Sequence, residues 1–171
     1  AQQAPLEIGA MRSAGVVRLH YADRYLLQAY TLRLLAEVMQ ATPGAKGATL
    51  AVDLARDERP PPDPRFLHSN FPTDTLRVEV LGHLLPGAGI ALRAKAELPH
   101  FRRLSAELAD GRRLDILLDQ GLGAWSVAGS PRHDFAAPAA TQARALAPAT
   151  FEVPAGRSPP PLAPQMIEAT S

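Results

Sequence analysis

The sequence predicts an α/β fold: a mixed sheet with two main helices packed on it, a late β-hairpin and an extended Pro-rich C-terminal tail. Short β-branched runs alternate with segments whose apolar residues recur every three or four positions, as in strands and amphipathic helices. An Asp-Gly pair separates two later strand-like runs. Because proline becomes frequent beyond Gly129, we expect an α/β domain over residues 1–128 and a tail over 129–171, which either stays loose or docks on a partner.

The first part of the chain contains one predicted helix between two predicted strands. Residues 16–21 are rich in β-branched and aromatic side chains, which favours a strand. Apolar residues recur at helical spacing over 25–39, with Asp23 as the expected cap and Pro-Gly at 43–44 as the end. Residues 49–54 form the kind of short apolar run that is buried inside a sheet covered by helices.

A second helix and a third strand follow a proline-rich loop at 59–64. Thr73 is the expected cap of a helix with apolar positions over 76–85, which ends at Pro-Gly at 86–87. Residues 90–96 alternate between apolar and polar, as in a half-exposed strand.

The late hairpin joins residues 104–109 to residues 112–118. Asp110-Gly111 between them favours a two-residue type I′ turn. A further short strand is expected at 124–127, and one short helix at 139–146, where Ala, Gln and Arg dominate.

The composition excludes several kinds of function. The formal net charge is +1, so no overall field indicates a nucleic-acid or membrane partner. The absence of cysteine excludes disulfides, thiolate nucleophiles and sulfur-based zinc sites. No apolar run approaches the ~20 residues of a membrane-spanning helix. Because the histidines lack ligand spacing and no glycine loop has the Walker or dinucleotide pattern, we expect no metal and no cofactor.

The most basic stretch, residues 93–113, is the main candidate for binding nucleic acid or a partner. Neighbouring side chains of a strand point to opposite faces, so only some of its cations can share a surface. The alternative is a charged hairpin that protects a sheet edge. Trp125, the single tryptophan, is expected in the core or at a partner interface. The binding candidates are Arg93, Lys95, Arg102, Arg103, Arg112, Arg113 and Trp125.

A polar cluster at residues 21–26 stands at the end of the first predicted strand, where α/β sheets often bind ligands. It is either a ligand site, or a place where Asp23 and Arg24 cap the following helix and pair locally.

Three residues of the basic stretch, His100, Arg102 and Glu107, form a pattern that resembles one half of the phospholipase D signature, His-x-Lys-x4-Asp. Arginine stands for the lysine and glutamate for the aspartate, and the chain has no second copy. In that family the histidine attacks phosphorus, the lysine holds phosphate oxygens and the acid completes the charge network. The resemblance implies catalytic roles for these three residues in a homodimer that joins two half-sites. It also fits degenerate members that act as binding modules.

These observations predict a non-catalytic or degenerate phospholipase D-like subunit, which binds a protein partner or nucleic acid in a cytoplasmic complex. A bacterial antiviral-defence complex is one expected setting, and no membrane partner is expected. The first alternative is a dimeric phosphodiesterase or nuclease of phospholipase D type. The second is a secreted or periplasmic interaction domain, in which Ala1 is a processed terminus.

Overall fold

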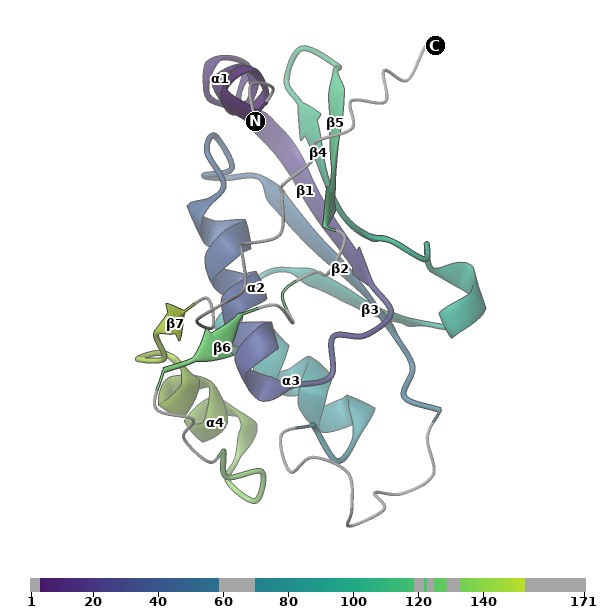
Figure 1. The fold of residues 1–171 in the computed structure, drawn as a ribbon, viewed down its shortest axis with the longest axis vertical. Coiled ribbons are helices and arrows are strands. Elements are labelled where there is room, and N and C mark those ends of the chain that lie inside the picture. The colour runs from purple at the N-terminus through teal and green to yellow at the C-terminus, as the bar shows by residue number, and fades with distance from the viewer. Residues whose placement is uncertain (1–3, 59–69, 119–121, 123–124, 129–132, 153–171) are drawn as a thin grey trace.

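The computed structural model describes residues 4–58, 70–118, 122, 125–128 and 133–152. The predicted loop at 59–64 and the end of the predicted tail, 153–171, lie outside these residues. Within the described residues the elements, shown in Figure 1, are α1 (Ala4–Ala14), β1 (Val16–Asp23), α2 (Ala29–Ala41), β2 (Thr49–Ala55), α3 (Asp74–Leu84), β3 (Gly89–Arg93), the 3₁₀-helix η1 (Lys95–Glu97), β4 (Arg102–Leu108), β5 (Arg113–Leu118), β6 (Ser126–Val127), α4 (Ala139–Leu146) and β7 (Phe151–Glu152).

Five strands form the main sheet in the order β3-β2-β1-β4-β5. β1, β2 and β3 run parallel, whereas β4 is antiparallel to β1 and β5 is antiparallel to β4. α2 connects β1 to β2 and α3 connects β2 to β3, and both helices cover the same face of the sheet (Figure 1). The predicted α/β class, with a mixed sheet, two main helices packed on it and a late hairpin, is therefore confirmed.

The main core lies between this face and the helices. Because side chains alternate along a strand, every second residue of β1 and β2 points toward α2 and α3. Burying each large apolar side chain stabilises the fold by roughly 1.5–3 kcal/mol. The apolar core residues with no exposed surface are Leu19, Leu32, Leu35, Met39, Val52, Leu54, Val80, Leu81 and Leu146.

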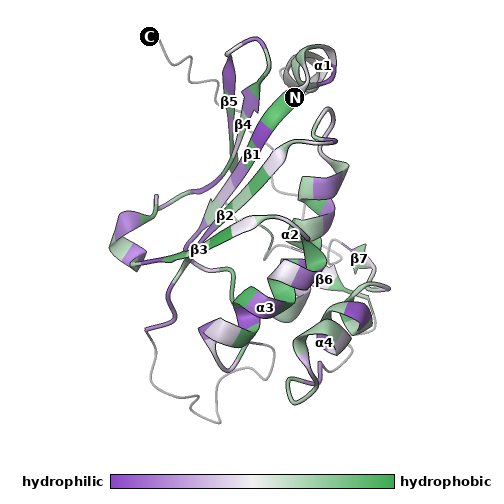
Figure 2. Cartoon of the chain, turned by 180° about the vertical axis from the view of Figure 1, so that it is seen from behind, coloured by the Kyte–Doolittle hydropathy of each residue, from purple (hydrophilic) through white to green (hydrophobic). Residues whose placement is uncertain are grey.

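The opposite face of the sheet, which we call the open face, carries no α-helix in the described part of the chain (Figures 1 and 2). Parallel strands are normally covered on both faces. Here the segment after β3 covers one end: Leu98 packs on Ala22 and Ala55 in a small second apolar cluster.

α2 begins at Ala29, later than the apolar spacing predicts. Its N-cap residue is Gln28, whose side chain makes no capping hydrogen bond, so the expected cap at Asp23 is wrong. Gln28 instead forms an isolated antiparallel bridge with Asn70, and this keeps the chain extended up to the helix. Thr73 caps α3 as predicted, since its hydroxyl oxygen accepts a hydrogen bond from the Leu76 amide at 3.2 Å.

β4 and β5 form the predicted hairpin, but the turn holds three residues. The Leu108 amide donates to Arg112 O at 2.8 Å, and the Gly111 amide donates to Leu108 O at 3.0 Å. Gly111 has a φ of 85°, so a β-turn is followed by a glycine in the left-handed region, the usual geometry of three-residue hairpin loops. The predicted type I′ turn is therefore wrong.

Two further helices complete the fold. α1 has no counterpart among the predicted elements. α4 has the bounds predicted for the helix at 139–146, and it buries Ala143 and Leu146 in the main core, at 7% and 0% exposure. Residues 133–152 therefore pack on the domain, although we expected no compact core there. The domain boundary at residue 128 stays a prediction.

Candidate functional site

A buried carboxylate marks the carboxyl end of β1. Asp23 is 2% exposed. Its Oδ1 accepts a hydrogen bond from the Tyr25 amide at 2.6 Å, and its Oδ2 accepts one from the Tyr21 hydroxyl at 2.7 Å. Arg102 Nε lies 3.4 Å from the same Oδ2. A carboxylate without water needs such partners because its desolvation is costly. Asp23 thus organises this end of the sheet, and does not cap the following helix.

Burial raises the pKa of Asp23 above its ordinary value of 3.8. The hydrogen bonds from Tyr25 and Tyr21 and the charges of Arg102 and Arg77 act in the opposite direction. The pKa of Tyr21 is raised well above its ordinary value, first by burial and then by the neighbouring Asp23 charge. Tyr21 therefore keeps its proton at neutral pH and acts as a hydrogen-bond donor.

Two cations lie over the ring of Tyr25. Lys95 Nζ and the guanidinium carbon of Arg102 are each 5.1 Å from the ring centroid, within the range of cation–π attraction. Tyr25 nevertheless remains 42% exposed. Since Arg102 contacts both this ring and the Asp23 carboxylate, a buried charge helps to fix the position of an exposed aromatic side chain.

Phe101 and His100 lie next to this arrangement, directly before β4. Phe101 is 55% exposed and His100 is also exposed, and their ring centroids are 5.6 Å apart in an edge-to-face geometry. Phe101 directly precedes Arg102, which β4 holds in place. We call the set of Tyr25, Lys95, His100, Phe101 and Arg102 the aromatic edge.

The open face carries four arginines, each of which alternates with a residue that faces the helices. They are Arg18 in β1, Arg93 in β3, Arg103 in β4 and Arg113 in β5. His20 also points to this face, and its Nε2 lies 3.2 Å from Asp53 Oδ2. Cations therefore extend across the sheet from β3 to β5.

Carboxylates pair with three of these arginines. The ion-pair distances are 3.6 Å for Arg93 with Asp53, 3.2 Å for Arg113 with Asp115 and 3.9 Å for Arg18 with Glu107. Among the described residues, no carboxylate pairs with Arg103, and its buried Nε has no hydrogen-bond partner. A buried donor without an acceptor costs about 1–3 kcal/mol. An anion bound to the remaining nitrogens of this guanidinium would balance a charge that no described carboxylate meets.

The predicted binding residues fall in different places. Lys95 and Arg102 belong to the aromatic edge, whereas Arg93, Arg103 and Arg113 lie on the open face. The alternation of β4 separates Arg102 from Arg103, so the cationic stretch serves two adjoining surfaces.

Two of the predicted binding residues lie elsewhere. Arg112 is in the hairpin turn, where its NH2 is 2.7 Å from Asp110 Oδ2. Trp125 is 40% exposed and directly precedes β6, which lies on the helical side of the molecule in both views (Figures 1 and 2). Neither side chain joins the aromatic edge.

The structure does not bring the predicted catalytic residues together. Arg102 faces the helices, and Glu107 faces the open face near Arg18. At about 3.3 Å per residue, roughly 16 Å of β4 separates these two positions. His100 lies before the strand, beside Phe101. A single chain therefore offers no shared position for these three groups around one phosphate.

Sequence reasoning missed Phe101, which is only a spacer in the phospholipase D pattern. Tyr25 lies within the polar cluster predicted at residues 21–26, but its pairing with the cations of the basic stretch was not predicted. The available signal was the interleaving of rings and cations, in Arg24-Tyr25 and in Phe101-Arg102-Arg103, which is typical of nucleic-acid surfaces.

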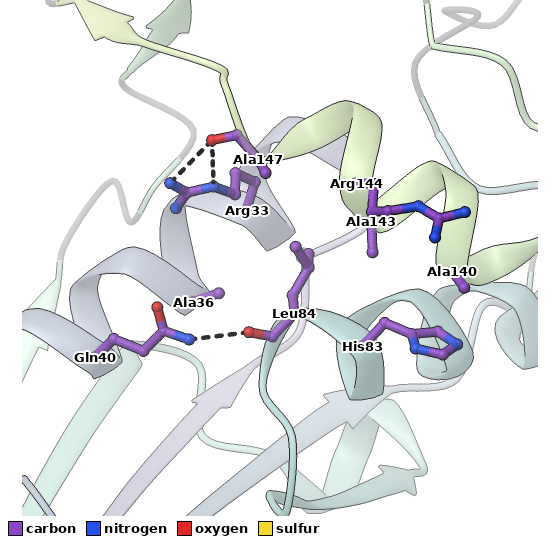
Figure 3. Close-up of a pocket in the computed structure, with 9 residues that line it drawn as sticks. All are labelled: Arg33, Ala36, Gln40, His83, Leu84, Ala140, Ala143, Arg144 and Ala147. Atoms are coloured by element: carbon purple, nitrogen blue, oxygen red, sulfur yellow. Dashed lines mark hydrogen bonds between the residues drawn. The ribbon is translucent and has the colours of Figure 1, made fainter.

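A groove of about 440 Å³ lies on the helical side, between α2, α3 and α4 (Figure 3). Arg33 in α2 donates from Nε and NH2 to Ala147 O after α4, at 3.4 and 3.3 Å. Gln40 Nε2 donates to Leu84 O at the end of α3, at 3.0 Å. These side chains satisfy carbonyl groups that helix ends leave without partners. Packing between the helices therefore explains the polar side chains Arg33 and Gln40 in this groove. The groove lies on the other side of the sheet from the open face.

Two other kinds of site are absent from the described residues. None of their helices is long and apolar enough to cross a bilayer. No three of their histidine, aspartate or glutamate side chains gather in a way that could hold a metal ion.

Comparison with known proteins assigns the chain to a different family from the one predicted. Comparison with curated proteins and with solved structures found no match. The family model described as DEAD/DEAH box helicase YjiV, C-terminal domain, matches residues 1–162. This match overturns the resemblance to phospholipase D, and with it the predicted phospholipase D-like subunit and the phosphodiesterase alternative. Because the match spans nearly the whole chain, the chain belongs to the family of the C-terminal domain of the DEAD/DEAH box helicase YjiV.

Proposed function

We propose that this domain binds nucleic acid for a helicase, through the aromatic edge and the open face. Its family is named after a helicase, an enzyme that acts on nucleic acid. The observation that carries the proposal is Arg103, a cation on a face without an α-helix, whose buried Nε has no acceptor among the described residues.

The neighbouring cations support a phosphate ligand. Arg18 and Arg93 are about half exposed and hold their carboxylates at 3.9 and 3.6 Å, and exposed pairs of this kind contribute little stability. Both side chains can therefore exchange a carboxylate for a phosphate at low cost. Arginine suits this role because its planar fork bonds two phosphate oxygens at once. The near-neutral net charge of the whole chain is compatible with such a local surface.

Substitution of Arg103 tests this proposal. We expect Arg103→Gln to weaken binding of a fluorescein-labelled oligonucleotide about tenfold, and to lower the slope of log K against log salt by about 1, because one phosphate contact is lost. Fluorescence anisotropy at several salt concentrations measures both quantities. Circular dichroism of each variant checks that the fold is kept.

Lys46→Gln is the matched control. Lys46 is exposed in the turn before β2, at the amino end of the parallel strands, so its loss should leave binding and salt slope unchanged. Equal losses in both variants would contradict a specific role for Arg103. No binding by the parent protein, even at low salt, would remove the proposal.

The expected protein partner, homodimer and cytoplasmic location stay predictions. Membership of a helicase family supports a place in a complex that handles nucleic acid.

A further inference from the structure

We infer that the aromatic edge takes unpaired bases, so that the nucleic acid bound by this domain is single-stranded. This inference rests on the proposed function and adds the kind of strand to it. Its starting point is the distribution of exposed large apolar side chains. Among the described residues these are Val17, Tyr25, Phe101 and Trp125. Tyr25 and Phe101 both belong to the aromatic edge.

The two rings are presented to solvent with cations beside them. Tyr25 is 42% and Phe101 is 55% exposed. Lys95 and Arg102 contact the first ring, and Arg102 directly follows the second. Single-strand sites combine these elements, because bases stack on aromatic faces while the backbone lies along positive charge. Protein interfaces also use aromatic and arginine side chains, but they are depleted in lysine, and here Lys95 lies over the Tyr25 ring.

The site is also organised before any ligand arrives. The amide of Tyr25 and the guanidinium of Arg102 both bind the buried Asp23 carboxylate. Arg24 donates from Nε and NH2 to Leu98 O, and this holds the segment that carries Lys95 and Phe101. Little conformational entropy is therefore lost when a base stacks, which strengthens binding.

The geometry separates base stacking from phosphate binding. Arg103 directly follows Arg102 and lies on the open face. A nucleic-acid strand whose bases stack on the rings can therefore place its phosphates toward Arg103 and Arg93. A duplex keeps its bases stacked inside, so only its phosphates and groove edges can reach this surface. Stacking on rings is also tolerant of sequence, because every base has an aromatic face. The domain should therefore prefer unpaired strands without a strong preference among the four bases.

The test uses three labelled ligands of about 15 nucleotides, a length near the site sizes of single-strand binders. They are an oligothymidine, a duplex, and an abasic strand that keeps sugars and phosphates but has no bases. We expect the parent protein to bind the oligothymidine about a hundredfold more tightly than either of the others, because each of the two stacked bases contributes roughly a factor of ten. Anisotropy at one fixed low salt concentration gives the three affinities.

The variant Phe101→Leu keeps an apolar side chain but removes the aromatic face. It should weaken oligothymidine binding about tenfold and leave binding of the abasic strand unchanged. Phe101→Tyr keeps the ring and should bind like the parent protein. Because Phe101 is more than half exposed, both variants are expected to fold, and a thermal melt checks this.

The outcomes distinguish this inference from the proposed function. If the abasic strand binds as tightly as oligothymidine, or if Phe101→Leu changes nothing, base stacking is excluded while binding through Arg103 stands. If none of the three ligands binds, the proposed function itself fails. A loss in Phe101→Leu that is confined to the oligothymidine supports the inference.

Discussion

At the scale of single residues, Asp23 connects the core with the surface. Its carboxylate accepts a hydrogen bond from Tyr21 within the sheet. It also binds two groups of the aromatic edge, the Tyr25 amide and the Arg102 guanidinium. An aspartate at the end of a strand is usually explained as a helix cap, and its position in the sequence suggested that interpretation. Its burial and its partners instead make it the internal support of an exposed site.

Asp23 also makes a prediction about pH. Because its pKa in the folded chain is raised above the ordinary 3.8, the folded state holds more protons than the unfolded state between these two pKa values. The stability from this group is complete below the ordinary pKa and is lost as pH rises through the folded-state pKa. The parent protein should have a larger free energy of unfolding than Asp23→Asn, and this difference should shrink as pH rises from about 3.8.

Urea denaturation of both proteins at a series of pH values measures this difference. Asp23→Asn should be less stable than the parent protein at every pH in the series, because an amide nitrogen, unlike either oxygen of a carboxyl group, cannot accept a hydrogen bond. A difference that stays constant, or grows with pH, would show that the burial of Asp23 does not control its titration.

At the scale of elements, α1 is held by Met11, which is 2% exposed in the main core, and by its C-terminal end. The Gly15 amide donates to Met11 O at 3.1 Å, with Gly15 at a φ of 77°, the usual left-handed end of a helix. Gly44 then packs against the same turn, and its carbonyl accepts a hydrogen bond from the Val16 amide at 3.0 Å. The loop after α2 therefore joins α1 to the start of β1.

Gly44 is the sensitive position of this junction. It has a φ of 75°, and a Cβ at this site would lie 2.2 Å from Met11 O. Gly44→Ala should lower the free energy of unfolding by about 2 kcal/mol or more, because backbone must move as well as adopt a strained φ. Gly47→Ala is the matched control, since Gly47 has a φ of 85° but open space around its Cβ. It should lose about 1 kcal/mol. Equal losses in urea denaturation would mean that the contact with Met11 does not matter.

The elements also show what local sequence can predict. β1, β2, α3 and the β4–β5 hairpin follow from patterns of a few residues, namely alternation, helical spacing, the Thr73 cap and Asp-Gly. α1 lacks a clear apolar stripe, so only Pro5 near its start and Gly15 just past its end indicate a helix in the sequence. The turn type was missed because Asp-Gly fits loops of two and of three residues, and hydrogen bonding across the strands decides between them.

The site was less predictable because it joins distant parts of the chain. Asp23, Lys95 and Arg102 meet only because β4 returns antiparallel beside β1 and the segment after β3 folds over the sheet. The basic stretch was found from composition, yet alternation along β4 divided it between two surfaces. The three-residue phospholipase D pattern misled because it ignored this alternation.

At the scale of the whole molecule, α4 joins residues beyond 133 to the core. Gln142 is 1% exposed, and its Nε2 donates to Phe135 O at 3.2 Å and to Ala137 O at 2.7 Å. Its Oε1 must then accept from His133 Nε2, at 2.8 Å. One buried amide thus holds the approach to α4 in a single conformation.

Replacing Gln142 tests whether α4 is a structural part of the domain. Gln142→Leu should lower the free energy of unfolding by about 2 kcal/mol or more, because three partly buried polar groups lose their partner together. Unfolding should remain a single transition, since Leu146 belongs to the main core. Gln40→Leu, at an exposed glutamine with one bond to Leu84 O, should cost less than about 1 kcal/mol. A separate early transition in Gln142→Leu, followed by circular dichroism and Trp125 fluorescence, would mean that α4 is an independent appendage.

The one-sided placement of α2, α3 and α4 has a thermodynamic consequence. The described chain supplies two layers of what is usually a three-layer sandwich, so any molecule that settles over β1 to β5 acts as the missing layer. Occupancy and folding are then linked by mass action: each ligand that prefers the folded chain raises its melting temperature, and each step that loosens the sheet releases the ligand.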